Sequence, residues 1–309
     1  MGKFTIGVDV GGTNVKLGLV NAFGKIIARS HLDTKAFIRN KHYLINALAQ
    51  SIINIYRDNS LAKKDVSGVG IGLPGLINPA KGVVDFLPNI PDWKNVPLQR
   101  LLESKTSLKI YLENDVNLIT LGEWKFGAGR GYKNLLCITL GTGVGGGLIL
   151  NDRLYRGEGF VAGEVGHMPL NEKGPACNCG GFGCFERYVG NKKLLADAIK
   201  IFKKPDLHLP DIYSLALQGD HRAVKFWNEV GTHIGNALVG VVNLLNPRLI
   251  IIGGGVAHNF RFFAPRIREV IRRRAMKVQA KMVNVVQSQL IDDAGIIGAQ
   301  VLVKDGIIA

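Results

Sequence analysis

Three cysteines within eight residues are the feature of this sequence that points most clearly to metal chemistry. Cys177, Cys179 and Cys184 stand in a glycine-rich segment that begins ten residues after His167. Thiolate sulfur and imidazole nitrogen suit a tetrahedral zinc ion, and the glycines allow a turn tight enough for several ligands to reach it. Four protein ligands would close the coordination sphere, so we expect a structural zinc. The alternative is a loop of reduced cysteines.

Two glutamates stand beside this cluster in the sequence. Glu164 precedes His167 by three residues, and Glu186 follows Cys184 by two. A metal that holds this loop in shape would also shape a substrate pocket around the two carboxylates. The imidazole nitrogen of His167 that is not on the metal could then bond a substrate hydroxyl. Each glutamate has a weaker claim alone, because surface glutamates are common.

A glycine turn near the N-terminus is a candidate phosphate site. Backbone N–H groups of glycines can approach a phosphate closely, a threonine hydroxyl can donate to it, and a preceding aspartate can reach Mg²⁺ or its water shell. The candidate residues of this turn are Asp9, Gly11, Gly12, Thr13, Asn14 and Lys16. The segment is not a Walker A loop, and taken alone it is more typical of a simple hairpin turn.

Two further glycine clusters strengthen the phosphate interpretation. Gly141-Thr142-Gly143 repeats the strand, turn and strand pattern of the first turn 130 residues later, which indicates two related halves. Gly254 and Gly255 follow an apolar run and offer a flat backbone surface for a base and ribose. Together the clusters predict a nucleotide clamp; the alternative is that each glycine cluster merely turns a strand.

An acidic and amide-rich segment supplies a candidate general base. Asn114 and Asp115 follow an apolar strand, where side chains at the carboxyl end of a strand point into a crevice. Asp115 could accept the proton of a hydroxyl as that oxygen attacks a γ-phosphate, and Asn114 would hold the same substrate. The alternative reading of Asp115 is an N-cap or Asx-turn residue.

Helical and strand-like segments alternate along the chain, which predicts an α/β fold. Apolar β-branched runs at 4–8, 15–20, 26–31, 66–73, 110–112, 135–150 and 249–252 predict strands. Helical spacing of apolar residues predicts helices at 41–58, 192–202, 212–217 and 221–245, and a last helix from near Asp293 that packs back on the first half. The expected domains are 1–116 plus 293–309, a smaller α/β domain, and 117–292, a larger one with the zinc loop.

Composition narrows the class of protein. The 309 residues are 47% hydrophobic and 20% charged, with a formal net charge of +15 and without an apolar run long enough to span a bilayer. A cytoplasmic protein without a membrane partner is the expectation. A basic stretch, Arg268 to Lys277, is expected within one helix over 266–281, and we interpret it as a solvated face rather than a nucleic-acid site.

Taken in order, these motifs resemble the ROK family of sugar kinases, a branch of the actin-like ATPase superfamily that also contains repressors. The resemblance includes Asp-Val-Gly-Gly-Thr-Asn from Asp9, Glu-Asn-Asp-Val-Asn from Glu113, the region from Ile138 to His167, and Cys-x-Cys-Gly-x-x-Gly-Cys-x-Glu from Cys177 to Glu186. It implies a two-domain actin-like ATPase (RNase H-like) fold with a cleft between the domains. It also implies that the protein binds ATP, Mg²⁺ and a structural Zn²⁺ and forms a homodimer.

The resemblance also implies roles for individual residues. Asp115 would be the catalytic base that deprotonates a sugar hydroxyl, O6 in a hexose, while the two glycine turns would hold phosphates and Gly254 and Gly255 the adenosine. His167, Cys177, Cys179 and Cys184 match the family's zinc ligands. The residues expected to contact the sugar are Gly75, Asn89, Asn114, Asp115, Glu164, His167 and Glu186.

The expected function is ATP-dependent phosphorylation of a hexose, glucose to glucose 6-phosphate. A kinase for N-acetylglucosamine or N-acetylmannosamine is the nearest alternative, because the same groups would bind the hydroxyls of either sugar class. A sugar-sensing transcriptional repressor is an alternative of another class. It is disfavoured because the first glycine turn lies within fifteen residues of Met1, which leaves no room for an N-terminal DNA-binding domain.

Overall fold

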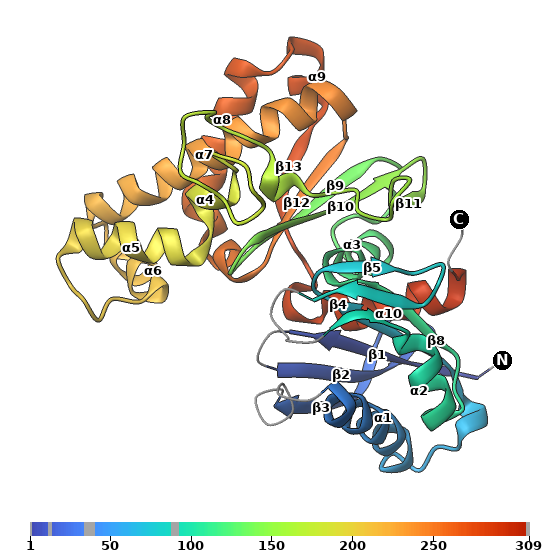
Figure 1. Ribbon diagram of the computed structural model, residues 1–309. Coiled ribbons are helices and arrows are strands. Elements are labelled where there is room, and N and C mark those ends of the chain that lie inside the picture. Colours follow the sequence, from blue (N-terminus) through green and yellow to red (C-terminus); the bar gives the residue numbers. More distant parts are fainter. Residues whose placement is uncertain (1, 12–13, 34–40, 88–92, 307–309) are drawn as a thin grey trace. The chain divides into compact units, whose positions relative to one another are not determined.

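The computed structural model describes residues 2–11, 14–33, 41–87 and 93–306, in which contacts divide the chain into two units (Figure 1). Unit 1 comprises residues 1–131, 154–162 and 289–309, and unit 2 comprises 132–153 and 163–288. The chain therefore passes from one unit to the other four times. The predicted domains, a smaller one of 1–116 plus 293–309 and a larger one of 117–292, stay a prediction.

Unit 1 contains a five-stranded sheet in the order β3-β2-β1-β4-β8. β1, β2 and β3 are antiparallel neighbours, whereas β4 and β8 run parallel to β1. Antiparallel neighbours can be joined by short turns, and the parallel strands require longer crossovers, which helices supply here. The strands are β1 (Phe4–Val10), β2 (Asn14–Asn21), β3 (Ile26–Asp33), β4 (Val66–Leu73) and β8 (Ile110–Asn114).

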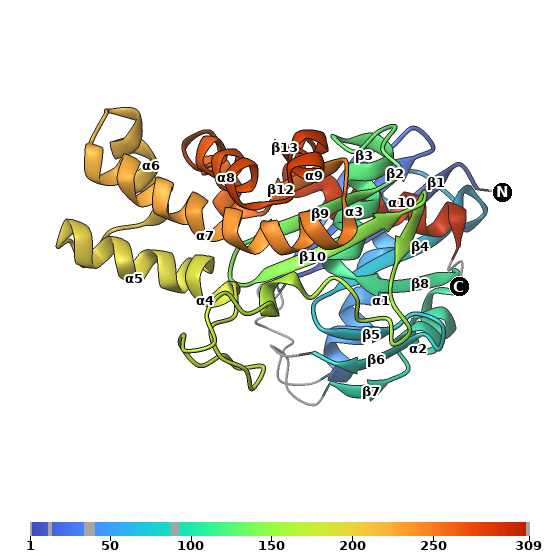
Figure 2. The same cartoon turned by 90° about the horizontal axis from the view of Figure 1, so that it is seen from above.

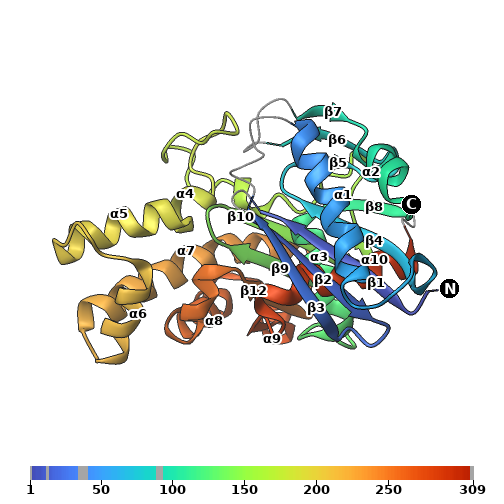
Figure 3. The same cartoon turned by 90° about the horizontal axis from the view of Figure 1, so that it is seen from below.

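Helices cover both faces of this sheet because side chains alternate along β1. Ile6 and Val8 belong to a buried cluster with α1 (Lys41–Arg57), which lies along the sheet in Figure 3. Gly7, between them, faces α10 (Ala294–Asp305), whose backbone at Ile296 occupies the space that a Cβ would need. The last helix thus packs back on the first half, as predicted.

The rest of unit 1 adds a three-stranded sheet and two helices. The small sheet has the order β5-β6-β7, and α2 follows it. α3 begins where β8 ends and crosses α10 closely. The bounds are 3-10 helix η2 (Lys63–Asp65), β5 (Leu76–Asn78), β6 (Val83–Phe86), β7 (Lys94–Val96), α2 (Leu98–Thr106), α3 (Asp115–Phe126) and 3-10 helix η5 (Ile291–Asp293).

Unit 2 contains a second five-stranded sheet in the order β11-β10-β9-β12-β13. β9 and β10 are antiparallel, and β12 and β13 run parallel to β9. The order and directions repeat those of the first sheet, with β9, β10 and β12 in the places of β1, β2 and β4, which confirms the predicted internal repeat. The strands are β9 (Leu135–Leu140), β10 (Val144–Leu150), β11 (Arg153–Tyr155), β12 (Leu249–Gly253) and β13 (Asn284–Gln287).

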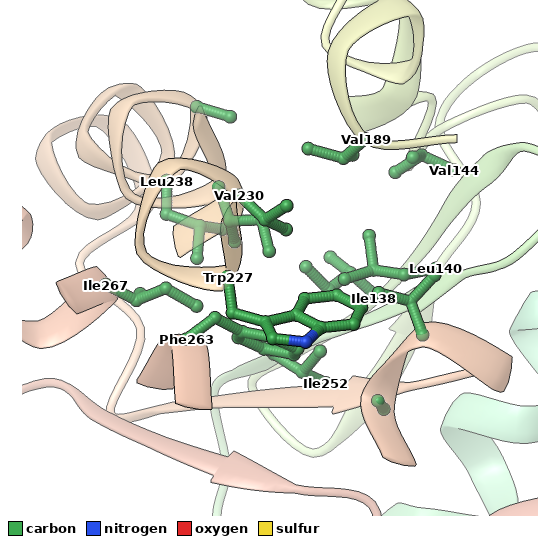
Figure 4. Packing of buried hydrophobic residues seen from close by; sticks show 14 of the residues in the cluster. Ile138, Leu140, Val144, Val189, Trp227, Val230, Leu238, Ile252, Phe263 and Ile267 are labelled. Atoms are coloured by element: carbon green, nitrogen blue, oxygen red, sulfur yellow. The ribbon is translucent and has the colours of Figure 1, made fainter. Parts of the chain in front are cut away.

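The helices of unit 2 gather beside this sheet (Figure 2). The long α7 packs on α8, and Trp227 of α7 lies in the core among Ile138, Leu140, Ile252 and Phe263 (Figure 4). The bounds are η3 (Val165–His167), α4 (Glu186–Val189), α5 (Asn191–Phe202), α6 (Leu209–Leu217), α7 (His221–Leu245), η4 (Gly255–Asn259), α8 (Phe260–Arg274) and α9 (Lys277–Met282).

The basic stretch differs from the prediction of one helix over 266–281. It is divided between α8 and α9, which are separated at Ala275 and Met276. The backbone N–H of Met276 donates to the side-chain oxygen of Asn243 on α7, 2.9 Å away, instead of continuing the helical ladder. The break between α8 and α9 therefore lies where the side chain of Asn243, on the neighbouring α7, accepts a backbone hydrogen bond.

No helix within the described residues is both long enough and apolar enough to span a bilayer.

Candidate functional site

The four predicted metal ligands come together in unit 2. The ligand atoms of His167, Cys177, Cys179 and Cys184 all lie within 4.8 Å of one another. The sulfurs of Cys179 and Cys184 are 3.6 Å apart, and the Cys177 sulfur is 3.7 Å from Nδ1 of His167. Sulfurs at about 2.3 Å from a tetrahedral zinc would lie roughly 3.8 Å from each other. The spacing of these donors therefore fits one zinc ion.

Backbone hydrogen bonds build this loop. The N–H of Gly180 donates to the carbonyl of Cys177 and the N–H of Cys177 donates to the carbonyl of Gly181, which closes a tight turn. Gly180 has a φ of 93°, a left-handed conformation that glycine adopts without steric cost. A backbone hydrogen bond from Gly181 lowers the pKa of the Cys179 thiol to about 7, whereas burial raises the pKa of Cys184 to about 12. Cys179 is thus the thiol that most readily forms a metal-binding thiolate.

His167 links the cysteines to the first of the two glutamates. Its Nδ1 faces the sulfur of Cys177, and its Nε2 lies 3.9 Å from Oε2 of Glu164. Both side chains remain partly exposed, so the Glu164 carboxylate and Nε2 can still be reached by a ligand. The two ring nitrogens thus face different groups, and the role of Nε2 toward a substrate stays a prediction.

Glu186 joins the zinc loop to the second glycine turn. Its Oε2 accepts a hydrogen bond from the N–H of Val144 at 3.0 Å, and a side chain at Gly143 would collide with the same oxygen. The turn is closed by the Gly141 N–H, which donates to the carbonyl of Gly143. The glycine at 143 therefore makes room for a carboxylate as well as for a phosphate.

The second and third glycine clusters lie side by side. Gly254 has a φ of 81° and packs so closely on the backbone of Leu140, directly before Gly141, that no Cβ fits between them. Thr142 stands in the turn, and Gly255 begins η4 with open space on its side-chain face. Unit 2 thus brings its two predicted nucleotide-binding glycine clusters to one end of its sheet.

Unit 1 carries the first glycine turn. The N–H of Gly11 donates to the carbonyl of Asn14, the same kind of closure as in the second turn, while Gly12 and Thr13 lie outside the described residues. Asp9 and Lys16 are opposite one another on β1 and β2. Burial raises the pKa of Asp9; Lys16 lowers it, and the nearby carboxylate of Asp292 raises it further. A divalent cation bound at this place would offset the cost of ionising Asp9.

The proposed base stands at a strand-to-helix corner of unit 1. Asn114 ends β8 and is the N-cap of α3: its side-chain oxygen accepts from the N–H groups of Val116 and Asn117. Asp115 is therefore the first residue of α3 rather than its cap, and the side-chain nitrogen of Asn114 is the part that can still donate to a substrate. Gly75 follows β4 with a φ of 107°, and Asn89 lies outside the described residues.

The sequence analysis missed three residues around these sites. Glu113 is buried and paired with Arg156, whose Nε lies 2.7 Å from its Oε2, and Asp292 adds its charge near Asp9. A carboxylate at the end of a buried strand requires a partner, so the sequence position of Glu113 indicates that a cationic side chain must reach it. The identity of that side chain could not be predicted, because Arg156 is 43 residues away in the sequence.

Comparisons with known proteins find relatives along nearly the whole chain. Residues 5–306 match the family model of the ROK family. A glucokinase of Thermotoga maritima is 36% identical over 316 residues, which cover 98% of each chain. A xylose repressor of Caldicellulosiruptor bescii is 30% identical over 96% of this chain and 77% of its own length.

A solved structure shares the fold. The crystal structure of a ROK family glucokinase from Streptomyces griseus in complex with glucose and AMPPNP has a TM-score of 0.83 and 32% identity to this chain, and the match covers 98% of this chain and 100% of that one. The expected two-domain actin-like ATPase fold is thereby confirmed. On the family match and these relatives, the chain belongs to the ROK family.

Proposed function

We propose that this protein is an ATP-dependent sugar kinase that converts glucose to glucose 6-phosphate. The observation that carries the proposal is the position of Asp115 on the first turn of α3, directly after β8, in a chain that aligns with glucokinases over nearly its whole length. Carboxyl ends of parallel strands are where α/β folds bind their ligands. This corner is therefore the expected place for a group that acts on a substrate.

Asp115 acts as the general base. Its carboxylate accepts the proton of the sugar O6 hydroxyl while O6 bonds to the γ-phosphorus of ATP, and the bond from that phosphorus to the β-γ bridging oxygen breaks. ADP leaves with the electron pair of that bond. Asn114 donates to a neighbouring sugar hydroxyl through its side-chain nitrogen, while its oxygen caps α3.

The remaining sugar contacts come from Glu164, His167 and Glu186 in unit 2, and from Gly75 and Asn89 in unit 1. With Nδ1 of His167 on the metal, Nε2 carries the ring proton and donates to a sugar hydroxyl, and the two carboxylates accept hydrogen bonds from hydroxyl groups. Orientation of O6 by several such bonds supplies the positioning on which phosphoryl transfer depends. The proposed sugar contacts are thus divided between the two units.

The nucleotide is held by the glycine turns. The turn at Gly11, Gly12 and Thr13, with Asn14 and Lys16, and the turn at Gly141, Thr142 and Gly143 hold the phosphates, and Gly254 and Gly255 lie against the adenosine. Asp9 holds Mg²⁺ directly or through water. When bound, Mg²⁺ neutralises charge on the β- and γ-phosphates.

Four protein donors would surround the proposed zinc, so the metal has a structural role: it would cross-link His167 to the cysteine loop. The contacts with the sugar are made by protein side chains. Because the Nδ1 side of the ring is committed to the sulfurs, Nε2 is aimed at Glu164 and the sugar.

A coupled assay with glucose, mannose, fructose, N-acetylglucosamine and N-acetylmannosamine tests the proposal. We expect the highest kcat/KM with glucose. Highest activity with an N-acetylhexosamine would favour that alternative, and phosphorylation of none of the five would contradict the kinase assignment.

Replacement of Asp115 by Asn tests the base. The amide keeps the shape of the side chain but cannot take a proton, so we expect kcat to fall by about 10²–10⁴ while calorimetry shows glucose affinity changed by less than about threefold. The exposed Asp58→Asn serves as the control. Near-normal kcat in the Asp115 variant would assign the base elsewhere.

The ROK repressors among the relatives make DNA binding the alternative function. Sequence-specific DNA binding without phosphorylation of any sugar would favour it. We also propose that the protein acts as a homodimer in the cytoplasm, where ATP is available; light scattering that reports a monomer at working concentration would reject the dimer.

A further inference from the structure

The buried ion pair between Glu113 and Arg156 lies directly beside the proposed base. Oε2 of Glu113 accepts from Nε of Arg156 at 2.7 Å, and the two side chains are only 2% and 10% exposed. Oε1 of Glu113 accepts from the N–H of Asn114 and from the side-chain nitrogen of Asn117, each at 3.0 Å. One carboxylate therefore contacts both residues that flank Asp115 and Val116.

Arg156 belongs to a short strap, residues 154–162, which begins within β11 and is a segment of unit 1 inserted between two segments of unit 2. The carbonyl of Arg156 accepts from the N–H of Ala162 at 2.9 Å, so Arg156 closes the neck of the strap. Gly163, the residue directly after the strap, has a φ of 97° and packs on the backbone of Gly146 in β10 without space for a Cβ. Glu164 is the next residue.

We propose that Arg156 is a positioning residue for the kinase reaction, acting through Glu113 on Asp115 and through the strap on Glu164 and His167. This inference rests on the proposed function. The strap is fixed at one end by the ion pair and at the other by the Gly163–Gly146 contact, so the orientation of Glu164 depends on where Arg156 is held. The same bond fixes the carboxylate that orients the first turn of α3.

The chemistry of arginine is required for this arrangement. Arg156 donates to Glu113 from Nε, the nitrogen that joins the guanidinium group to the aliphatic part of the side chain. The rest of the guanidinium group therefore extends beyond this hydrogen bond. A lysine ammonium is a single point of charge at the end of a flexible chain and cannot reproduce this geometry. A buried pair contributes little net stability compared with apolar side chains of the same size, but loss of one partner leaves the other charged and unpaired.

Steady-state kinetics on the full chain test the inference. Arg156→Met should lower kcat by about 100-fold, as expected when reacting groups are misplaced by about 1 Å, and raise the KM for glucose. The KM for ATP should change by less than about twofold, because the hydrogen bonds of the pair within the described residues lead to Asn114, Asn117 and Ala162. Arg156→Lys should restore only part of kcat.

Two further variants separate positioning from general damage. Glu113→Gln combined with Arg156→Met removes both charges, and we expect the double variant to lose no more kcat than Arg156→Met alone, since the two side chains act as one unit. Arg153→Met, an exposed arginine on β11, is the matched control and should leave all kinetic constants unchanged. Additive losses would contradict the coupling.

Hydrogen exchange supplies a readout that does not depend on activity. In Arg156→Met we expect faster amide exchange in both 113–118 and 157–168, and unchanged exchange in β9 and β12. Exchange unchanged in either segment, or Arg156→Met kinetics equal to those of the unaltered enzyme, would overturn the positioning role. If the unaltered protein phosphorylates no sugar, the proposed function fails, and the exchange result still decides whether the pair organises these two segments.

Discussion

At the scale of single residues, His167 links two parts of the proposed site, because each of its two ring nitrogens faces a different group. Nδ1 faces Cys177 and Nε2 faces Glu164, so the orientation of the nitrogen proposed to bind the sugar depends on the cysteine loop. Metal-binding histidines are commonly oriented by a partner on their other nitrogen. Here that partner position is the one a substrate can share.

Removal of one cysteine should therefore affect metal content and sugar binding together. We expect Cys184→Ala to reduce zinc from about one ion per chain, the count that four ligands predict, to well below half, and to raise the KM for glucose. Elemental analysis and kinetics measure the two effects. Cys137→Ala, a buried cysteine in β9 away from the cluster, should keep its zinc; equal zinc in both variants would exclude the site.

At the scale of elements, the crossing of α3 and α10 shows how glycines bring the C-terminal helix against the helix of Asp115. A Cβ at Gly298 would overlap the backbone oxygen of Leu118, and one at Gly122 would overlap that of Ala294. The two helices can be this close only because neither has a side chain at the crossing.

We expect Gly298→Ala to lower the free energy of unfolding by about 1–3 kcal/mol or more, the usual cost of overpacking. Urea unfolding measures the loss. Gly240→Ala in the middle of α7 is the control: its nearest neighbour would be the end of the Met168 side chain at 3.6 Å, so alanine should be tolerated or stabilising. Equal stability of the Gly298 variant would mean that the crossing adjusts freely.

The start of α7 gives a pH-dependent prediction. A hydrogen bond from Arg222 lowers the pKa of Asp220, the N-cap of α7, to about 2. Because the folded-state pKa lies below the ordinary value, the carboxylate stabilises the fold above about pH 4, and this contribution is lost as pH falls through about 2. We expect Asp220→Asn, which keeps a cap but no charge, to be less stable than the native chain at pH 7 and to approach it only near pH 2. A constant difference in urea midpoint would reject the ion pair as the cause.

At the scale of the whole molecule, the repeated glycine turns and the apolar runs predicted the two related sheets because both signals are local in sequence. The cluster of one histidine and three cysteines was equally predictable, since its four residues lie within eighteen residues. The Glu113–Arg156 pair was not, because it joins residues 43 positions apart. The break between α8 and α9 was missed for a similar reason: it involves Asn243 of another helix.

Hydrogen bonds and ion pairs within the protein engage several arginines in and beside the basic stretch. Arg266 and Arg273 pair with Glu269, Arg268 donates to the carbonyl of Val285, and Arg274 donates to Asn236. These arginines bond to the protein's own atoms, which supports the interpretation of a solvated, self-contained face.

Metal removal should act on one unit. With the ligands confined to unit 2, a strong chelator should accelerate hydrogen exchange in 164–190 and leave β1, β4 and α10 protected. Mass spectrometry of the exchanged protein measures both regions in one sample. Uniform acceleration across both sheets would indicate that the metal holds the entire fold together.

The three tryptophans provide an optical means to follow these events. Trp93 is buried in the core of unit 1, Trp227 in that of unit 2, and Trp124 follows Glu123, whose buried carboxylate accepts from the N–H groups of Gln289 and Leu290 where the chain re-enters unit 1. Lys125 lies over the Trp124 ring with its Nζ 3.5 Å from the centroid, close enough to perturb its emission. Single-tryptophan variants would therefore give three separate fluorescence signals, one from each core and one from the re-entry point, without an added dye.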